Sequence, residues 1–201
     1  MLDVLRPFTA LPGYGVGALV VLLLYAIQSE IRFGAKARMI TAGPEDRGST
    51  WAVGLSSAVP VIGFVLAMKT RASPGLRLMP AMPHIAWVGV CVGALGVLIR
   101  LWSVLTLRDG YTRTLLVGTS HSFERGGPYR FVRHPGYLGS LLTLNGIALA
   151  SGDLLTLIVS VAATAVAYTY RIRVEDAMLL SRFGAAYQHY REHVGAVLPF
   201  G

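Results

Sequence analysis

The chain has 201 residues, of which 54% are hydrophobic and 14% are charged, and its mean hydropathy is +0.57. Soluble domains rarely have this composition, so we predict an integral membrane protein with a single domain over residues 1–201. The net charge of +8 does not indicate a nucleic-acid partner, because the sequence offers no soluble basic domain that could bind one.

The apolar segments predict an all-α, polytopic fold with about five transmembrane helices. In chain order, the spans are expected near residues 14–28, 51–68, 84–107, 137–151 and 154–170. Small residues in the third span, at Gly89, Gly93 and Gly96, indicate either close helix packing or a gap between helices. Residues 151–153 (Ser-Gly-Asp) provide turn chemistry between the last two spans. These spans should therefore form an antiparallel hairpin whose far ends meet at one membrane face.

Basic residues are distributed unevenly among the segments that connect the spans. Most Lys and Arg lie on the side that carries the connections at 32–47 and 108–135 and the residues after the fifth span. The positive-inside rule places that side in the cytoplasm. Arginine greatly outnumbers lysine, an association with GC-rich bacterial genomes. We therefore expect a multi-pass protein of a bacterial cytoplasmic membrane, with its functional site facing the cytoplasm.

Two segments on this side can build a ligand site. The connection 108–135 is rich in glycine and proline, so we expect irregular backbone there rather than helix. Irregular backbone beside a membrane needs hydrogen-bond partners, and lining a ligand is one of the few ways to supply them. Residues 174–193 are predicted to form an amphipathic helix that lies on the membrane surface or covers that loop.

Polar side chains concentrate at the two ends of the hairpin, in RFVRHPGY (130–137) and RIRVED (171–176). Each has a plain structural interpretation: His134 can end a turn, Tyr137 can anchor at the interface, and the two acids can pair with neighbouring arginines. The alternative is a polar ligand that needs them, since polar groups at membrane depth are costly. Arg100, inside the third span, either reaches the surface or serves such a site.

Several other chemistries have no support in the sequence. No group of His, Cys or carboxylates has recognisable zinc-ligand spacing, so no metal is expected. No P-loop or GxSxG motif is present, and GYGVG at 13–17 lacks the strand-turn-helix context of a dinucleotide site. Cys91 is the single cysteine, which rules out an intramolecular disulfide.

Four motifs follow one another in the second half of the sequence. They are HSFERGGPY at 121–129, RHPGYLG at 133–139, RIRVED at 171–176 and FGAAYQHY at 183–190, with the hairpin between the second and the third. In this order and spacing they resemble the isoprenylcysteine carboxyl methyltransferase family. The likeness extends from about Arg100 to the C-terminus, and the agreement of several motifs makes it specific.

The resemblance implies an integral-membrane methyltransferase that uses S-adenosylmethionine and releases S-adenosylhomocysteine. Its cofactor site would be built from residues 108–137 and 171–201. The cofactor-binding residues carried over by position are His121, Phe123, Glu124, Tyr129, His134, Pro135, Gly136, Tyr137 and Glu175. Arg171 would face an acceptor carboxylate and Arg100 approximately matches a polar residue of the corresponding span, so these two are the expected catalytic residues. The acceptor would be a lipophilic or lipidated molecule that enters from the bilayer.

A carboxylate acceptor is already ionised at neutral pH, so Arg171 is expected to position it rather than to transfer a proton. The runner-up activity is N-methylation of a phospholipid amine, for which Glu175 or His134 would have to accept a proton. A further alternative is an NADPH-dependent sterol-type reductase, because such enzymes share the RHPxY turn, although Ser140 stands where they commonly have glutamate. The last alternative is a membrane adaptor without catalytic activity. Asp176 replaces a second glutamate of many family members, and its role is left open.

Overall fold

The computed structural model describes residues 13–31, 46–69, 83–107 and 123–199. Its elements are α2 (Gly13–Ile31), α3 (Ser49–Lys69), α4 (Pro83–Leu107), the short 3-10 helix η6 (Gly127–Arg130), α5 (Pro135–Ala150), α6 (Leu154–Phe183) and α7 (Ala185–His193). These described residues contain no strand, which confirms the all-α prediction. A helix lies at each of the five places where the sequence predicts a span.

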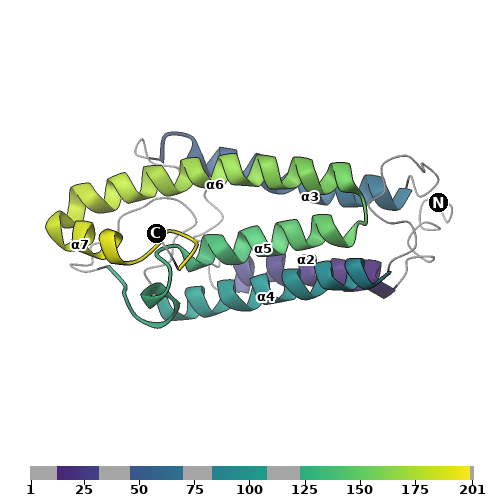
Figure 1. Cartoon of the computed structure of the whole chain (residues 1–201), viewed down its shortest axis with the longest axis horizontal. Coiled ribbons are helices and arrows are strands. Elements are labelled where there is room, and N and C mark those ends of the chain that lie inside the picture. The colour runs from purple at the N-terminus through teal and green to yellow at the C-terminus, as the bar shows by residue number, and fades with distance from the viewer. Residues whose placement is uncertain (1–12, 32–45, 70–82, 108–122, 200–201) are drawn as a thin grey trace.

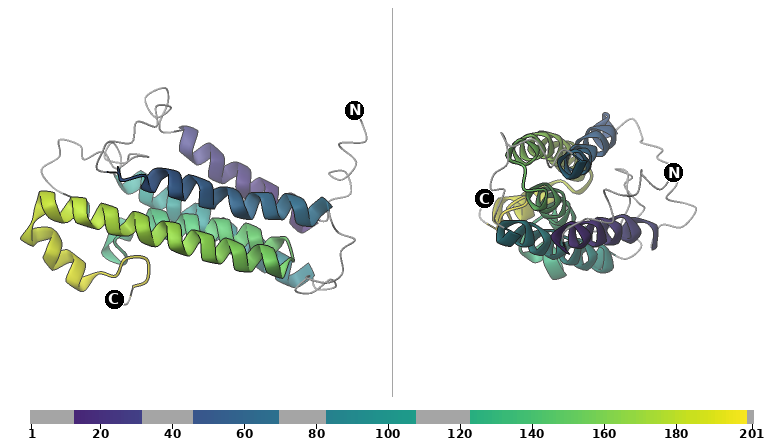
Figure 2. Two further views of the ribbon diagram at one scale, coloured as in Figure 1. Left: turned by 90° about the horizontal axis from the view of Figure 1, so that it is seen from above. Right: turned by 90° about the vertical axis from the view of Figure 1, so that its right-hand side faces the viewer.

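The five long helices run side by side along one axis, with α5 in the middle (Figure 1). Seen from the end, α3 and α6 pair on one side of α5, and α2 and α4 lie on the other (Figure 2). Most residues of α5 are buried among these four neighbours, which explains why its sequence has no polar stripe. The bundle core joins Ala18 of α2, Phe64 of α3, Val97 of α4 and Ile147 of α5.

Three of these helices, α3, α4 and α6, are long and apolar enough to cross a membrane. The apolar part of α2 is shorter, and α5 has 16 residues. Large apolar side chains on the outer faces of the helices are exposed, for example Leu55 and Val166, each at 71%. Such surfaces suit lipid rather than water, so the protein is integral to a membrane.

Glycines bring α4 and α5 into close contact. A Cβ added at Gly96 would lie 2.5 Å from the Gly139 carbonyl oxygen and 2.5 Å from the Thr143 nitrogen. One at Gly89 would lie 2.5 Å from the Ala150 nitrogen. Of the two interpretations of the small residues in α4, close packing is therefore the one confirmed.

The predicted hairpin of α5 and α6 is confirmed. Asp153 caps α6, because its side chain accepts a hydrogen bond from the Thr156 N–H at 2.6 Å. Asn145 of α5 ties the arms together: it accepts from the Ser160 hydroxyl at 2.8 Å and donates to the Thr164 hydroxyl at 3.1 Å.

The end of α6 differs from the prediction. The apolar run stops at residue 170 and predicts that the span ends there, but the helix continues through RIRVED to Phe183. The backbone hydrogen bonds of the helix do not require apolar side chains, and Arg171, Glu175 and Asp176 each have polar partners at this end of the bundle. It ends at Gly184, whose φ of +51° lies in the left-handed region. The amphipathic helix predicted over 174–193 is thus divided between the end of α6 and α7.

Candidate active site

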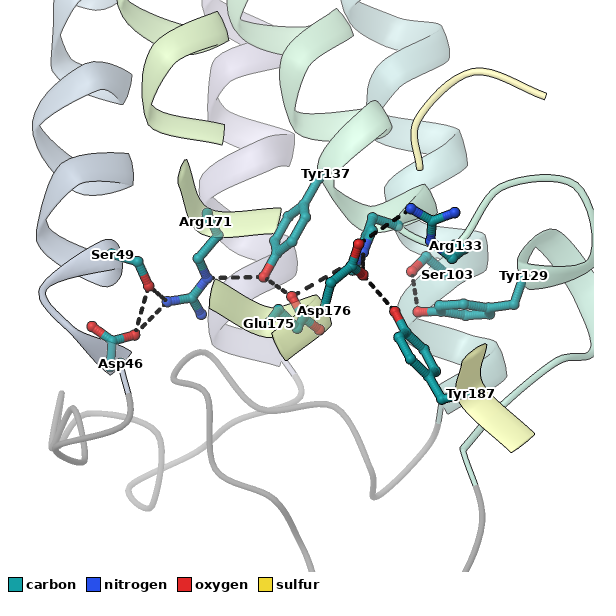
Figure 3. Close-up of polar contacts among 11 residues, drawn as sticks. Asp46, Ser49, Ser103, Tyr129, Arg133, Tyr137, Arg171, Glu175, Asp176 and Tyr187 are labelled. Atoms are coloured by element: carbon teal, nitrogen blue, oxygen red, sulfur yellow. Dashed lines mark hydrogen bonds and ion pairs between the residues drawn. The ribbon is translucent and has the colours of Figure 1, made fainter. Parts of the chain in front are cut away.

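The polar residues of both motifs gather at one end of the bundle, where α3 and α5 begin and the second half of α6 passes them (Figure 3). Residues 123–134 and α7 close this end from the side. The close-up shows connected polar contacts from Asp46, before α3, to Tyr187 in α7, and a separate contact between Ser103 and Tyr129 of η6.

The RHPGY turn delivers the first groups of the site. Pro135 is the first residue of α5 and His134 precedes it, so α5 starts here as the sequence predicts. The backbone N–H groups of Arg133 and His134 donate to the carbonyls of Gly195 and Ala196, at 2.8 and 2.9 Å. These bonds fix the turn against the segment that follows α7. His134, Pro135 and Gly136 are all buried.

Asp176 connects three groups, Arg133, His134 and Tyr187, and we call these four residues the Asp176 network. His134 Nε2 lies 2.9 Å from Asp176 Oδ1, and Arg133 donates to Oδ2 at 3.2 Å. The Tyr187 hydroxyl of α7 donates to Oδ1. Burial, followed by this bond to a carboxylate, raises the pKa of Tyr187 well above its ordinary value, so the phenol remains a donor. Asp176 therefore joins α5, α6 and α7.

A second set of contacts, the Arg171 network, lies beside the first. The Tyr137 hydroxyl donates to Glu175 Oε2 at 2.5 Å and accepts from Arg171 Nε at 2.9 Å. Arg171 Nη1 donates to Asp46 Oδ1 at 2.5 Å and to the hydroxyls of Ser49 and Thr50 at 2.8 and 2.7 Å. The two networks meet at His134, whose Nδ1 lies 3.7 Å from Glu175 Oε2 and whose ring stacks on Tyr137.

Asp46 is a site residue that the sequence analysis missed. Burial opposes its ionisation, but hydrogen bonds from Thr50 and Ser49, together with Arg171, hold the pKa of Asp46 below its ordinary value. An aspartate three residues before Ser-Thr and an apolar run is a signal for a helix N-terminus. That signal could have predicted the cap, but not the contact with Arg171, which is 125 residues away in sequence.

The loop before α5 contributes aromatic groups. The Phe123 ring contacts Phe183, Tyr187 and Tyr190, with ring centroids 5.2 to 5.3 Å apart. The Tyr129 hydroxyl bonds to Ser103 of α4 at 2.7 Å. Tyr190 donates to the Tyr129 carbonyl, and burial raises the pKa of Tyr190 to about 12.

Other predicted site residues lie farther from the two networks. Glu124 is exposed and accepts hydrogen bonds from the N–H groups of Arg125 and Gly126, within its own loop. Arg100 donates to the Ser140 hydroxyl at 2.8 Å and lies over the Tyr25 ring, so it has partners at membrane depth. His121 lies outside the described residues.

One expectation about metals needs correction. His189, Glu192 and His193 on one face of α7 have ligand atoms within 4.8 Å of one another, a spacing that could hold a metal ion. The statement that no such group has metal-ligand spacing is therefore wrong for this turn of helix. All three side chains are exposed, and the opposite face of α7 carries Tyr187 and Tyr190 toward the site.

These features define the protein as a helical membrane protein with a buried ionic site at one end of its bundle, and comparisons with known proteins give the family. A family model described as phospholipid methyltransferase matches residues 85–186. The protein-S-isoprenylcysteine O-methyltransferase of Tribolium castaneum is 30% identical over 60% of this chain and 45% of its own length. Protein-S-isoprenylcysteine O-methyltransferase A of Arabidopsis thaliana is 30% identical over 74% of this chain and 79% of its own.

A solved structure shares the fold. The eukaryotic intramembrane Ras methyltransferase ICMT (isoprenylcysteine carboxyl methyltransferase) matches with a TM-score of 0.72 and 21% identity, over 95% of this chain and 69% of its own. The chain belongs to the family described as phospholipid methyltransferase, and its likeness to the Arabidopsis thaliana relative also groups it with the protein-S-isoprenylcysteine O-methyltransferases. It is a membrane-embedded methyltransferase, and S-adenosylmethionine is the methyl donor that such a family implies.

Proposed function

We propose that the protein transfers a methyl group from S-adenosylmethionine to the carboxylate of a lipophilic acceptor held in the membrane. The main observation behind this proposal is that the two networks touch. Their contact brings together four residues at one end of a lipid-facing bundle: His134, Tyr137, Arg171 and Glu175. Each of these residues was predicted from its motif. The names of the relatives support a prenylated cysteine as the first acceptor to test.

The charges of the two networks suit a cationic cofactor. Three carboxylates, Asp46, Glu175 and Asp176, face two guanidinium groups, Arg133 and Arg171. The carboxylates outnumber the guanidinium groups, so a ligand that carries a sulfonium and an amine is favoured over a polyanion such as NADPH. The family match likewise favours methyl transfer over the reductase alternative.

Two details of hydrogen bonding also fit this cofactor. If His134 Nε2 donates to Asp176, Nδ1 carries a lone pair, and Glu175 Oε2 is a second acceptor 3.7 Å away. An amine or hydroxyl donor between them would satisfy both. Arg133 Nε is buried and has no hydrogen-bond partner among the described residues, so it could receive a carboxylate.

In this proposal, His134, Pro135, Gly136, Tyr137 and Glu175 hold the cofactor against the RHPGY turn. Phe123 and Tyr129 close the site from the loop, Glu124 contributes through the backbone it orders, and His121 belongs to the same motif. Tyr187 and Tyr190 of α7 keep that helix over the site through Asp176 and the Tyr129 carbonyl.

S-adenosylmethionine supplies a methyl group on positively charged sulfur, so a carboxylate oxygen forms the new C–O bond as the C–S bond breaks, and no proton moves. The residues of the site then have only to align the acceptor and exclude water. Arg171 positions the acceptor carboxylate, and Arg100, held by Ser140 and Tyr25, lines its approach from the membrane. We place this end of the bundle at the cytoplasmic side of a bacterial membrane, from the distribution of basic residues.

Methylation of a phospholipid amine is the second candidate, and the description of the matched family favours it. That reaction needs a base, and Glu175, which is a quarter exposed and beside His134, is the group that could accept the proton. The identity of the methyl acceptor, a carboxylate or an amine, therefore distinguishes the two candidate reactions.

Two measurements test the proposal. Calorimetric titration of the detergent-solubilised protein should show binding of S-adenosylhomocysteine and none of NADPH. The protein should then form the carboxyl methyl ester of N-acetyl-S-farnesylcysteine. N-methylated lipid from phosphatidylethanolamine, without any ester, would select the second candidate. Binding of NADPH instead of S-adenosylhomocysteine would refute both.

A further inference from the structure

Arg171 is neutralised by a carboxylate from a distant part of the chain. Arg171 is 4% exposed and Asp46 is fully buried, and their Nη1 and Oδ1 atoms lie 2.5 Å apart. Nη1 also faces the Ser49 and Thr50 hydroxyls. A nitrogen with two hydrogens and three acceptors is already saturated. All hydrogen-bonding capacity of Nη1 is therefore used by residues at the start of α3.

The turn that presents Asp46 is held in a costly conformation. Arg47 has a φ of +47°, in the left-handed region that non-glycine residues seldom adopt, and Gly48 follows at +76°. The Tyr170 hydroxyl, one residue before Arg171, donates to the Arg47 carbonyl at 2.7 Å. Asp46 itself accepts from the Thr50 N–H at 3.0 Å. Contacts from α3 and α6 thus fix this carboxylate in place, and strain of this kind persists only where the surroundings over-determine it.

We propose that Asp46 is the counter-ion that sets how strongly Arg171 holds the acceptor: it cancels the guanidinium charge, so the acceptor carboxylate is oriented without losing its nucleophilicity. This inference rests on the proposed carboxyl methylation. It adds a positioning residue from the N-terminal half of the chain, where the sequence carries no recognisable motif.

The physical reason is the balance between ground state and transition state. An unpaired buried guanidinium would bind an acceptor carboxylate tightly, and that attraction fades as the carboxylate becomes a neutral ester. Tight binding would therefore stabilise the reactant more than the transition state and slow the reaction. With Asp46 present, Arg171 contributes direction through hydrogen bonds and little net charge.

The test is Asp46→Asn, measured with N-acetyl-S-farnesylcysteine as acceptor. The isosteric amide can still accept hydrogen bonds but leaves Arg171 charged. The KM for the acceptor should fall, and kcat should fall with it, each on the order of tenfold. Affinity for S-adenosylhomocysteine should stay within about twofold, which shows that the variant is folded. An unchanged or raised KM overturns the inference.

Asp153→Asn is the matched control, because Asp153 also caps a helix but lies at the opposite end of the bundle. Asp153→Asn should leave KM and kcat unchanged. If it lowered both constants as Asp46→Asn is expected to do, our explanation would be refuted.

A measurement on the unaltered protein keeps the inference falsifiable if Asp46→Asn does not fold. The carboxamide analogue of the acceptor should compete about as well as the carboxylate, within roughly tenfold, because the charge next to it is already cancelled. A carboxylate that binds more than about 100-fold tighter than the amide would refute the role of Asp46. If the unaltered protein binds S-adenosylhomocysteine but makes no ester, the proposed function fails, and this inference with it; if ester forms without the KM effect, only the inference fails.

Discussion

Asp176 is the residue whose removal should disturb this end of the protein most. Asp176→Asn keeps the shape of the side chain but removes a charge that receives hydrogen bonds from Arg133 and Tyr187 and contacts His134. The carboxylate side chain is only 10% exposed, so solvent screens these contacts weakly. Breaking a buried ion pair by removing one partner costs about 3–5 kcal/mol, and the retained amide oxygen places this change at the lower end, about 3 kcal/mol.

This loss should lower the thermal midpoint of the detergent-solubilised protein by about 6–12 °C, at 2–4 °C per kcal/mol for a chain of this length. Because Tyr187 ties α7 to Asp176, amide hydrogen exchange should also speed up in α7. Glu192→Gln is the control, since Glu192 is an exposed acid on α7 that bonds only locally to Gln188. Our account of Asp176 is wrong if the two variants have the same midpoint and α7 keeps its protection.

Three further changes test the site and the packing. Glu175→Gln should weaken S-adenosylhomocysteine binding by roughly tenfold in calorimetry, because a charged acceptor is lost, and Glu192→Gln should not; equal affinities would remove Glu175 from the cofactor site. Gly96→Ala should cost about 2 kcal/mol of stability, seen as a lower thermal midpoint, since its Cβ would meet α5 backbone at 2.5 Å. Gly54→Ala, with nothing within 4 Å, should cost nothing, and a similar loss in both would refute the packing argument. Arg171→Lys should slow turnover by about tenfold to a hundredfold while S-adenosylhomocysteine affinity is kept; a reversed pattern would place Arg171 at the cofactor instead.

The helices were predictable because lipid imposes one simple requirement on them. A spanning segment must be apolar and helical, so hydropathy locates the five long helices, of which α3, α4 and α6 are long and apolar enough to cross a membrane, and the turn at 151–153 orders the last two. The end of α6 was not predictable in the same way. Hydropathy falls at Arg171, but a helix is held by hydrogen bonds between its own backbone groups, and these continue whether the side chains are apolar or polar.

The candidate site was predictable in part. His134, Tyr137, Arg171 and Glu175 lie in motifs and meet as expected, although their roles stay predictions. Asp176 was left open because a sequence does not reveal that one carboxylate has three partners, two in the turn before α5 and one in α7. Asp46 was missed since no local pattern encodes a contact with a residue 125 positions later.

The two arms of the hairpin differ greatly in reach. At about 1.5 Å per residue, the 16 residues of α5 extend about 24 Å and the 30 residues of α6 about 45 Å. Both arms meet at residues 151–153, so Tyr137 lies about 20 Å and Arg171 about 26 Å along its helix from that turn, each less than the roughly 30 Å thickness of a hydrocarbon core. With the turn at one surface of the hydrocarbon core, the proposed lipid-anchored acceptor would meet these residues at acyl-chain depth. Under the proposed function, turnover should then vary with the chain length of the host lipid.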